Sequence, residues 1–126
     1  MRNDCTLHHR TQVAELGQKV LGDRLIGLQL GNEPDLYYHN GLRNPNYTVN
    51  DYNTDFGTFL NDYNDDPGIT NKTMFLAPSV CCGNGIGWTP EQVFDTGFLN
   101  NYAGNLAYLS VQQCVSVPAV IEERKV

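Results

Sequence analysis

The run of residues 25–35 constrains the fold of this chain more than any other stretch. Its first six residues are mostly apolar and have the composition of a short strand. Gly31, Asn32 and Glu33 come next, and Pro34 then ends regular strand pairing because proline has no backbone N–H to donate. We therefore expect Asn32 and Glu33 at the C-terminal end of a buried strand, the edge where α/β proteins place their active sites.

Helical and strand-like segments alternate along the rest of the chain. We expect helices at 4–22, about 49–64 and about 90–105, and strands at 25–30, 73–80 and 108–112. The second helix has the clearest pattern, because six apolar or aromatic residues fall on one face: Val49, Tyr52, Phe56, Phe59, Leu60 and Tyr63. This order of elements predicts an α/β fold in which helices cover parallel strands.

Local patterns predict how the helices begin, break and pack. Thr48 or Asn50 can cap the second helix, and Thr89 opens a capping box with Pro90 at the first helical position. Gly97 should interrupt the third helix. Three apolar residues at helical spacing give the first helix an apolar stripe: Val13, Leu16 and Val20.

Length and charge exclude several classes of partner. With 126 residues the chain fits one ordinary domain. Its net charge of −6 argues against nucleic acid or an anionic membrane as a partner, and its basic residues form no stripe. No run of apolar residues is long enough to span a membrane. We therefore expect neither a nucleic-acid partner nor a membrane partner.

Two features favour an extracellular protein. Asn46 and Asn71 each begin an N-x-[ST] pattern, which makes both candidate glycosylation acceptors. The four cysteines are compatible with disulfides, although they do not form a dense framework. The first residues contain no apolar signal-peptide core. We reconcile these observations by expecting further residues upstream of Met1.

The string of residues 28–37 resembles fungal members of glycoside hydrolase family 79, the β-glucuronidase and heparanase-like group. Four shorter matches support it: residues 40–43, the helix start at 47–52, residues 79–82 and residues 109–112. The likeness covers roughly residues 4–112 and then stops abruptly. We therefore divide the chain into a partial barrel domain, 1–112, and an unmatched tail, 113–126.

The resemblance implies a (β/α)₈ barrel, which needs about 250 residues when complete. This chain would supply about three βα units, containing the fourth, fifth and sixth strands. Glu33 would be the catalytic acid/base and Asn32 would bind the sugar 2-hydroxyl of a β-linked glucuronide, with no metal and no cofactor. The family is secreted and uses a second Glu, on the seventh strand, as nucleophile.

That nucleophile has no counterpart in the matched part of this chain. Glu122 and Glu123 fall in the unmatched tail, and the role is not carried onto either. Retaining glycosidases need two carboxyl groups about 5–5.5 Å apart. The sequence therefore predicts a fragment of a retaining glycoside hydrolase that is inactive by itself. Two alternatives stay open: a non-catalytic carbohydrate-binding fragment or pseudoenzyme, and a small α/β protein in which Asn32 and Glu33 only turn the chain.

Other polar and aromatic residues near the predicted site allow more than one role. Arg43 and His39 could face a uronate carboxylate, although a solvated loop is favoured. Trp88 suits a sugar cleft and core packing equally. Three alternatives stay open for Cys81 and Cys82: disulfides to cysteines elsewhere in a longer protein, a vicinal disulfide with each other, or two reduced thiols. Neither this pair nor the adjacent histidines at 8–9 has the spacing of a zinc site.

Overall fold

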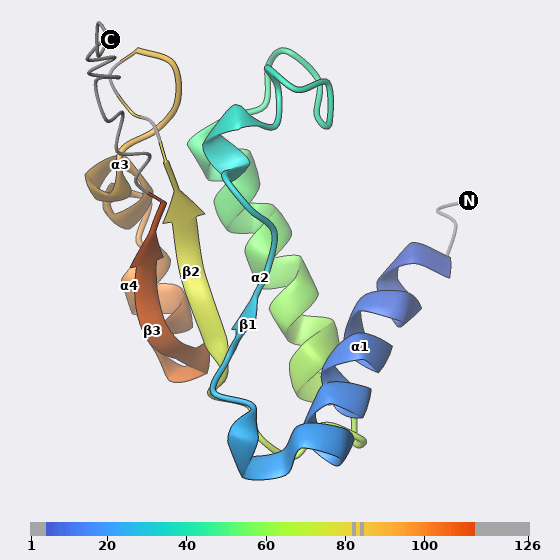
Figure 1. The fold of residues 1–126 in the computed structure, drawn as a ribbon. Helices are drawn as coiled ribbons and strands as arrows, with labels where there is room; N and C mark the ends of the chain where they lie inside the picture. Colours follow the sequence, from blue (N-terminus) through green and yellow to red (C-terminus); the bar gives the residue numbers. More distant parts are fainter. Residues whose placement is uncertain (1–4, 82, 84, 113–126) are drawn as a thin grey trace, which may run out of the picture.

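The computed structural model describes residues 5–81, 83 and 85–112. Its longer elements are α1 (Cys5–Leu21), β1 (Leu28–Gln29), α2 (Val49–Asp65), β2 (Phe75–Val80), α3 (Pro90–Asp95), α4 (Phe98–Tyr102) and β3 (Leu106–Val111). Three 3₁₀ turns connect them: η1 (Gly22–Arg24), η2 (Pro34–Leu36) and η3 (Ala103–Asn105). Figure 1 shows their arrangement. The tail predicted at 113–126 lies outside the described residues.

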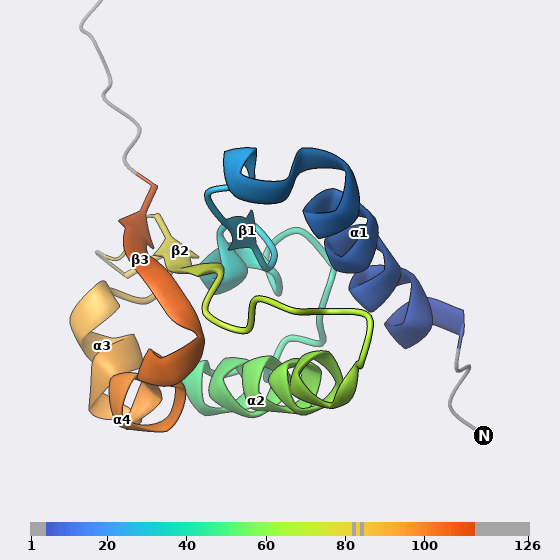
Figure 2. The same ribbon diagram turned by 90° about the horizontal axis from the view of Figure 1, so that it is seen from below.

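The strands in the described part of the chain form one parallel sheet in the order β1-β2-β3. Helices α2, α3 and α4 lie along one side of this sheet, and α1 lies next to α2 beyond the β1 edge (Figure 2). The predicted α/β class with parallel strands and covering helices is therefore confirmed. Because β2 is central, β1 and β3 each have one edge without a strand partner in this sheet.

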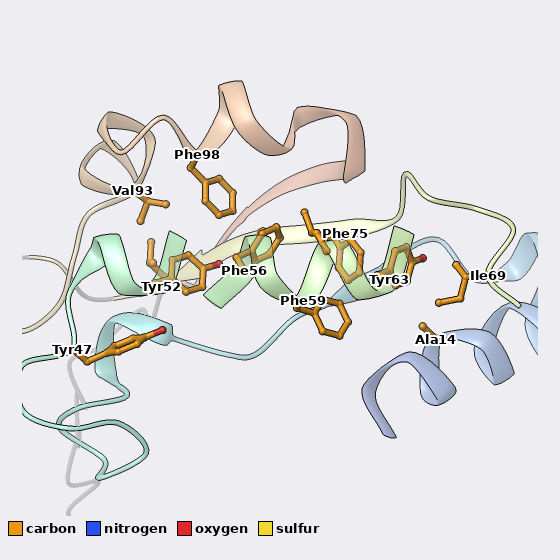
Figure 3. Close-up of a cluster of buried hydrophobic side chains, with 13 residues drawn as sticks. Ala14, Tyr47, Tyr52, Phe56, Phe59, Tyr63, Ile69, Phe75, Val93 and Phe98 are labelled. Atoms are coloured by element: carbon orange, nitrogen blue, oxygen red, sulfur yellow. The ribbon is translucent and has the colours of Figure 1, made fainter. Parts of the chain in front are cut away.

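The core lies between β2 and the helices on its covered side. The predicted face of α2 is confirmed: Tyr52, Phe56, Phe59, Leu60 and Tyr63 are all buried. Phe75 of β2 lies against this face, with its ring centroid 4.7 Å from that of Tyr63. Phe98 of α4 lies 4.8 Å from Phe56. Figure 3 shows the rings of Tyr52, Phe56, Phe75 and Tyr63 in a row along the sheet, with Phe98 on one side of the row and Phe59 on the other. Aromatic packing therefore joins α2 and α4 to β2.

The helix boundaries follow the predicted chemistry. Thr48 caps α2 through a box with Asp51: the Asp51 N–H donates to the Thr48 hydroxyl at 3.2 Å, and the Thr48 N–H donates to the Asp51 carboxylate at 2.8 Å. Thr89 caps α3 in the same way, through Gln92. Gly97, at φ 82°, separates α3 from α4. The predicted caps and the predicted interruption are therefore confirmed.

The predicted apolar stripe of α1 is exposed. Val13, Leu16 and Val20 are 67%, 60% and 70% exposed, whereas Thr11 and Ala14 on another face of the helix are buried. An apolar stripe on a helix usually faces the core, but this one faces away from it. Its spacing suits burial, but in the described part of the chain the packed side of α1 is the one that carries Ala14.

The strands differ from prediction in length and burial. The strand expected at 25–30 is reduced to the two residues of β1, Leu28 half-buried and Gln29 exposed, so it is an edge strand rather than a buried one. The segment before β1 can approach β2 closely because residue 27 is glycine: a Cβ at this position would lie 2.1 Å from the Leu76 side chain. β2 begins two residues later than expected and ends at Val80 as expected, whereas β3 begins two residues earlier and ends one residue earlier.

Candidate functional site at the carboxyl ends of the strands

The predicted site residues lie where β1 ends and η2 begins. Glu33 has a left-handed backbone, with φ 50° and ψ 58°, and its N–H donates to the carbonyl of Ser79 at 3.1 Å. Ser79, near the end of β2, also has a positive φ of 55°. A left-handed conformation costs a residue other than glycine about 1–3 kcal/mol. Two such residues are joined here by a backbone hydrogen bond, so backbone strain is concentrated at the ends of β1 and β2.

A row of polar side chains connects all three strand ends. The Asn32 Oδ1 accepts a hydrogen bond from Gln29 Nε2 at 3.0 Å, and Gln29 Oε1 in turn accepts from Gln112 Nε2 at 3.4 Å. Deeper in the sheet, the hydroxyls of Ser79 and Ser110 lie 2.6 Å apart. The Asn32 oxygen is thereby engaged as an acceptor, while its amino group retains two donor hydrogens.

Asp35 fixes the turn that carries Glu33. The side chain is fully buried, and its Oδ1 accepts from the Cys81 N–H at 3.1 Å. Gly87 lies against the same carboxylate, since a Cβ at that position would fall 2.1 Å from Oδ2. Turn η2 is thus attached to the loop after β2 by the buried Asp35 side chain. Cys81 is disulfide-bonded, so the alternative of a free thiol there is wrong; Cys82 lies outside the described residues.

The loop candidates for binding a uronate have other contacts. Arg43 pairs with Asp55 of α2 at 3.3 Å and lies 5.4 Å from the centroid of the Tyr47 ring. The His39 Nε2 lies 2.6 Å from the carbonyl oxygen of Ile86. Asn32 therefore lies with the polar side chains of the strand ends. Arg43 does not join this group, because it forms an ion pair with Asp55 of α2.

Trp88 belongs to the packing rather than to the strand-end row. Its ring centroid lies 5.9 Å from that of Tyr47 and 6.0 Å from that of Tyr52. Both tyrosines are buried members of the core. Of the two roles that the sequence allowed for Trp88, the structure shows packing.

The remaining sequence candidates lie on the surface. Asn46 and Asn71 are both exposed, which suits glycosylation, and their modification stays a prediction. Among the residues that the structure describes, no three His, Cys, Asp or Glu side chains gather in a way that could hold a metal ion. A search of the same residues finds no helix with the length and apolar character needed to cross a membrane.

Sequence reasoning assigned no role to several residues that build the site. Gln29, Ser79, Ser110 and Gln112 fall in predicted strands, and Asp35 follows the predicted site residues without a role of its own. Their polarity within otherwise apolar strands is the signal that could have found them. No protein-family model, curated protein or solved structure matches this chain. Fold and site together define an α/β unit whose polar residues collect at the carboxyl ends of parallel strands.

Proposed function

We propose that this chain is part of a retaining glycoside hydrolase that acts on β-linked glucuronides, with Glu33 as its acid/base. The observation that carries the proposal is the position of Glu33: it follows β1 in a left-handed conformation and bonds to Ser79 of the neighbouring strand. Strained backbone of this kind persists where the surrounding structure enforces it, and it clusters at active sites. The carboxyl ends of parallel strands are where α/β enzymes place catalytic groups.

Each residue has a distinct part in the proposed reaction. Glu33 protonates the leaving oxygen as the glycosidic bond breaks and then takes a proton from the water that completes hydrolysis. The Asn32 amino group donates to the sugar 2-hydroxyl, and the bond from Gln29 to the Asn32 oxygen orients that amide. The second carboxylate that the reaction needs, about 5–5.5 Å from the first, would come from another strand of the barrel.

Exposed apolar residues at both sheet edges support the proposed barrel. Leu16 of α1 and Ile26 before β1 are exposed at one edge, and Tyr108, Leu109 and Val111 are exposed on β3 at the other. In a closed barrel each strand has two neighbours and each helix packs between others, so neither edge stays open. Further βα units on both sides would bury these side chains.

A ligand titration followed by NMR tests the proposal on the 126-residue chain. Adding 4-nitrophenyl β-glucuronide should shift the amide signals of residues 31–34 and of the strand ends near Ser79 and Ser110. Asn32→Ala should abolish these shifts, because it removes the donor to the sugar. The matched variant Asn61→Ala, at an exposed position of α2, should leave them unchanged. No shift at 31–34, or shifts that survive Asn32→Ala, would overturn the proposed function.

The same samples distinguish catalysis from binding. The exposed amides of Gln29 and Asn32 also suit a carbohydrate-binding fragment without catalysis, because they can bind sugar hydroxyls without a nucleophile. Under both functions the chain alone should release no nitrophenol, since removing one member of a catalytic pair forfeits most of the rate. Turnover that Glu33→Gln abolishes would contradict the fragment interpretation. Activity of the chain joined to further barrel strands, lost in Glu33→Gln, would decide for catalysis.

A further inference from the structure

A cavity of about 380 Å³ lies between the loop after β1 and helix α2. Leu30 and Tyr37 line it from the loop side, and Phe56 and Phe59 line it from α2. Neither Asn32 nor Glu33 is among its lining residues. Its volume falls within the range of small-molecule sites, which are usually apolar with a few placed polar groups. The cavity is therefore a candidate site separate from the strand-end row.

The α2 side of the cavity is aromatic. Phe56 and Phe59 are both almost completely buried, and the half-buried Leu30 faces the same space. Both rings are already packed against other rings, Phe56 against Phe98 and Phe59 against Phe75, so they close the cavity without offering a free face. The apolar surface left for a ligand comes from the half-buried Leu30 and Tyr37 and the exposed Leu42, which together suit a small ring.

The charged groups at the cavity neutralise each other. Arg43 pairs with Asp55 at 3.3 Å, and the same carboxylate accepts from the Tyr47 hydroxyl at 3.0 Å. Burial, and then the nearby Asp55 carboxylate, raises the pKa of Tyr47 far above its ordinary value, so its phenol stays a neutral donor. A charged ligand would have to displace one of these partners and lose its own water, which is costly.

Tyr37 provides a polar group at the wall of the cavity. A Cβ on Gly31 would lie 2.0 Å from the Tyr37 hydroxyl oxygen, so this hydroxyl can occupy its place only because residue 31 is glycine. Gly31 also has a φ of 82°, which other residues rarely adopt. A phenol hydroxyl both donates and accepts, and it therefore suits a ligand hydroxyl.

We propose that this cavity binds a small, uncharged aromatic alcohol. The ring would lie against Leu30, Leu42 and the Tyr37 ring, and its hydroxyl would form a hydrogen bond with the Tyr37 hydroxyl. The proposal concerns a different set of side chains from the strand ends, and it does not depend on the chemistry of Glu33. The Arg43–Asp55 ion pair disfavours charged ligands. The volume of the cavity limits the ligand to a small ring system.

Titration of the 126-residue chain with 2-naphthol, followed by calorimetry, tests this proposal. Leu42 lines the cavity and is 61% exposed, so Leu42→Trp should obstruct the site without disturbing the core, and binding should be lost. Leu109→Trp, at a similarly exposed position on β3, is the matched control and should bind normally. Equal binding by the Leu42→Trp variant would overturn the proposal.

A second pair of variants tests the polar contact. Tyr37→Phe should weaken 2-naphthol binding about fivefold, the factor expected for one lost hydrogen bond worth about 1 kcal/mol. Tyr38→Phe makes the same change at the neighbouring residue, whose hydroxyl donates to the Ile86 carbonyl, and should leave the affinity unchanged. Naphthalene-2-carboxylate should bind more weakly than 2-naphthol. Tighter binding of the carboxylate, or an equal loss in both tyrosine variants, would overturn the assigned ligand class.

Discussion

Apolar side chains are buried on the covered side of the sheet and exposed at its two edges. On the covered side, Phe56, Tyr63 and Phe98 are almost completely buried among other rings. At the edges, Leu16 of α1 and Leu109 of β3 are more than half exposed, although both are as apolar as many core residues. The difference lies in the available neighbours: α2 and β2 each face another apolar element, whereas the edges face none in the described part of the chain.

Hydrogen bonding follows the same division. The tyrosines of the covered side keep their rings in the core and still satisfy their hydroxyls: Tyr52 donates to the Pro78 carbonyl, Tyr63 to the Asn71 carbonyl and Tyr102 to the Asn53 carbonyl. At the β1 and β3 edges, backbone groups are open to a further strand, which is the usual route by which sheets extend or associate. The covered side is thus complete in itself, while the edges are suited to adding partners.

The largest expected effect is on the covered side. Phe56→Ala should lower the free energy of unfolding by about 3–5 kcal/mol, because it removes a buried ring and leaves a cavity. Leu16→Ala, on the exposed stripe of α1, should change it by less than about 0.5 kcal/mol. Urea denaturation followed by tyrosine and tryptophan fluorescence measures both. Similar losses in the two variants would show that the α1 stripe is buried in solution and would break the comparison.

The next effect concerns the edges. We expect the purified chain to self-associate, because β1 and β3 leave strand edges and apolar side chains open. Sedimentation equilibrium should show a mean mass that rises with protein concentration. Leu109→Lys should weaken association by about tenfold, or about 1.4 kcal/mol, because an edge lysine opposes strand pairing.

The matched control for this edge variant is Asn61→Lys, which adds the same charge at an exposed position on α2. It should leave the association constant unchanged. A strictly monomeric chain at all concentrations, or equal weakening by both lysine variants, would contradict the role assigned to the β3 edge.

The smallest effect tests the cap that begins the core helix. Thr48→Ala should destabilise the chain by about 1 kcal/mol, the usual cost of losing an N-cap. Hydrogen bonds from the Thr48 side chain and then its backbone lower the pKa of Asp51 below its ordinary value of 3.8. The stability from this bond is therefore present above that value and is lost as the pH falls through the lower folded pKa.

An NMR titration of the Asp51 carboxyl checks this sign. In Thr48→Ala the Asp51 pKa should rise toward 3.8. The free energy of unfolding of this variant should therefore depend less on pH in the acid range, because the capping box no longer contributes to it. Glu91, near the start of α3, also has a lowered pKa, caused first by its own backbone N–H and then by the Thr89 side chain, and it should not change. An Asp51 pKa unaffected by Thr48→Ala would contradict the capping box in solution.

Much of the architecture was predictable because its signals are local. The face of α2 from Tyr52 to Tyr63, the caps at Thr48 and Thr89 and the break at Gly97 each depend on residues within a few positions of one another. Steric limits, hydrogen-bond spacing and helical periodicity act over that range and are readable without a structure. The order of helices and strands then implied parallel pairing.

The candidate site was predictable only in its location. Proline after a Gly-Asn-Glu run indicated that Glu33 follows a strand, and the structure places it there. The bond from Glu33 to Ser79, the buried anchor from Asp35 to Cys81 and the link from Gln29 to Gln112 all join residues that are more than 40 positions apart. No local rule selects such pairs.

By itself, the sequence determined which segments become helices and strands, where the helices begin and where the chain turns at Glu33. The tertiary structure alone decided that Ala14, rather than Leu16, is the buried side of α1, and that Arg43 binds Asp55 of α2. The physical reason is the range of the forces involved. Backbone geometry and capping act within one turn, whereas burial depends on which distant surface arrives to exclude water.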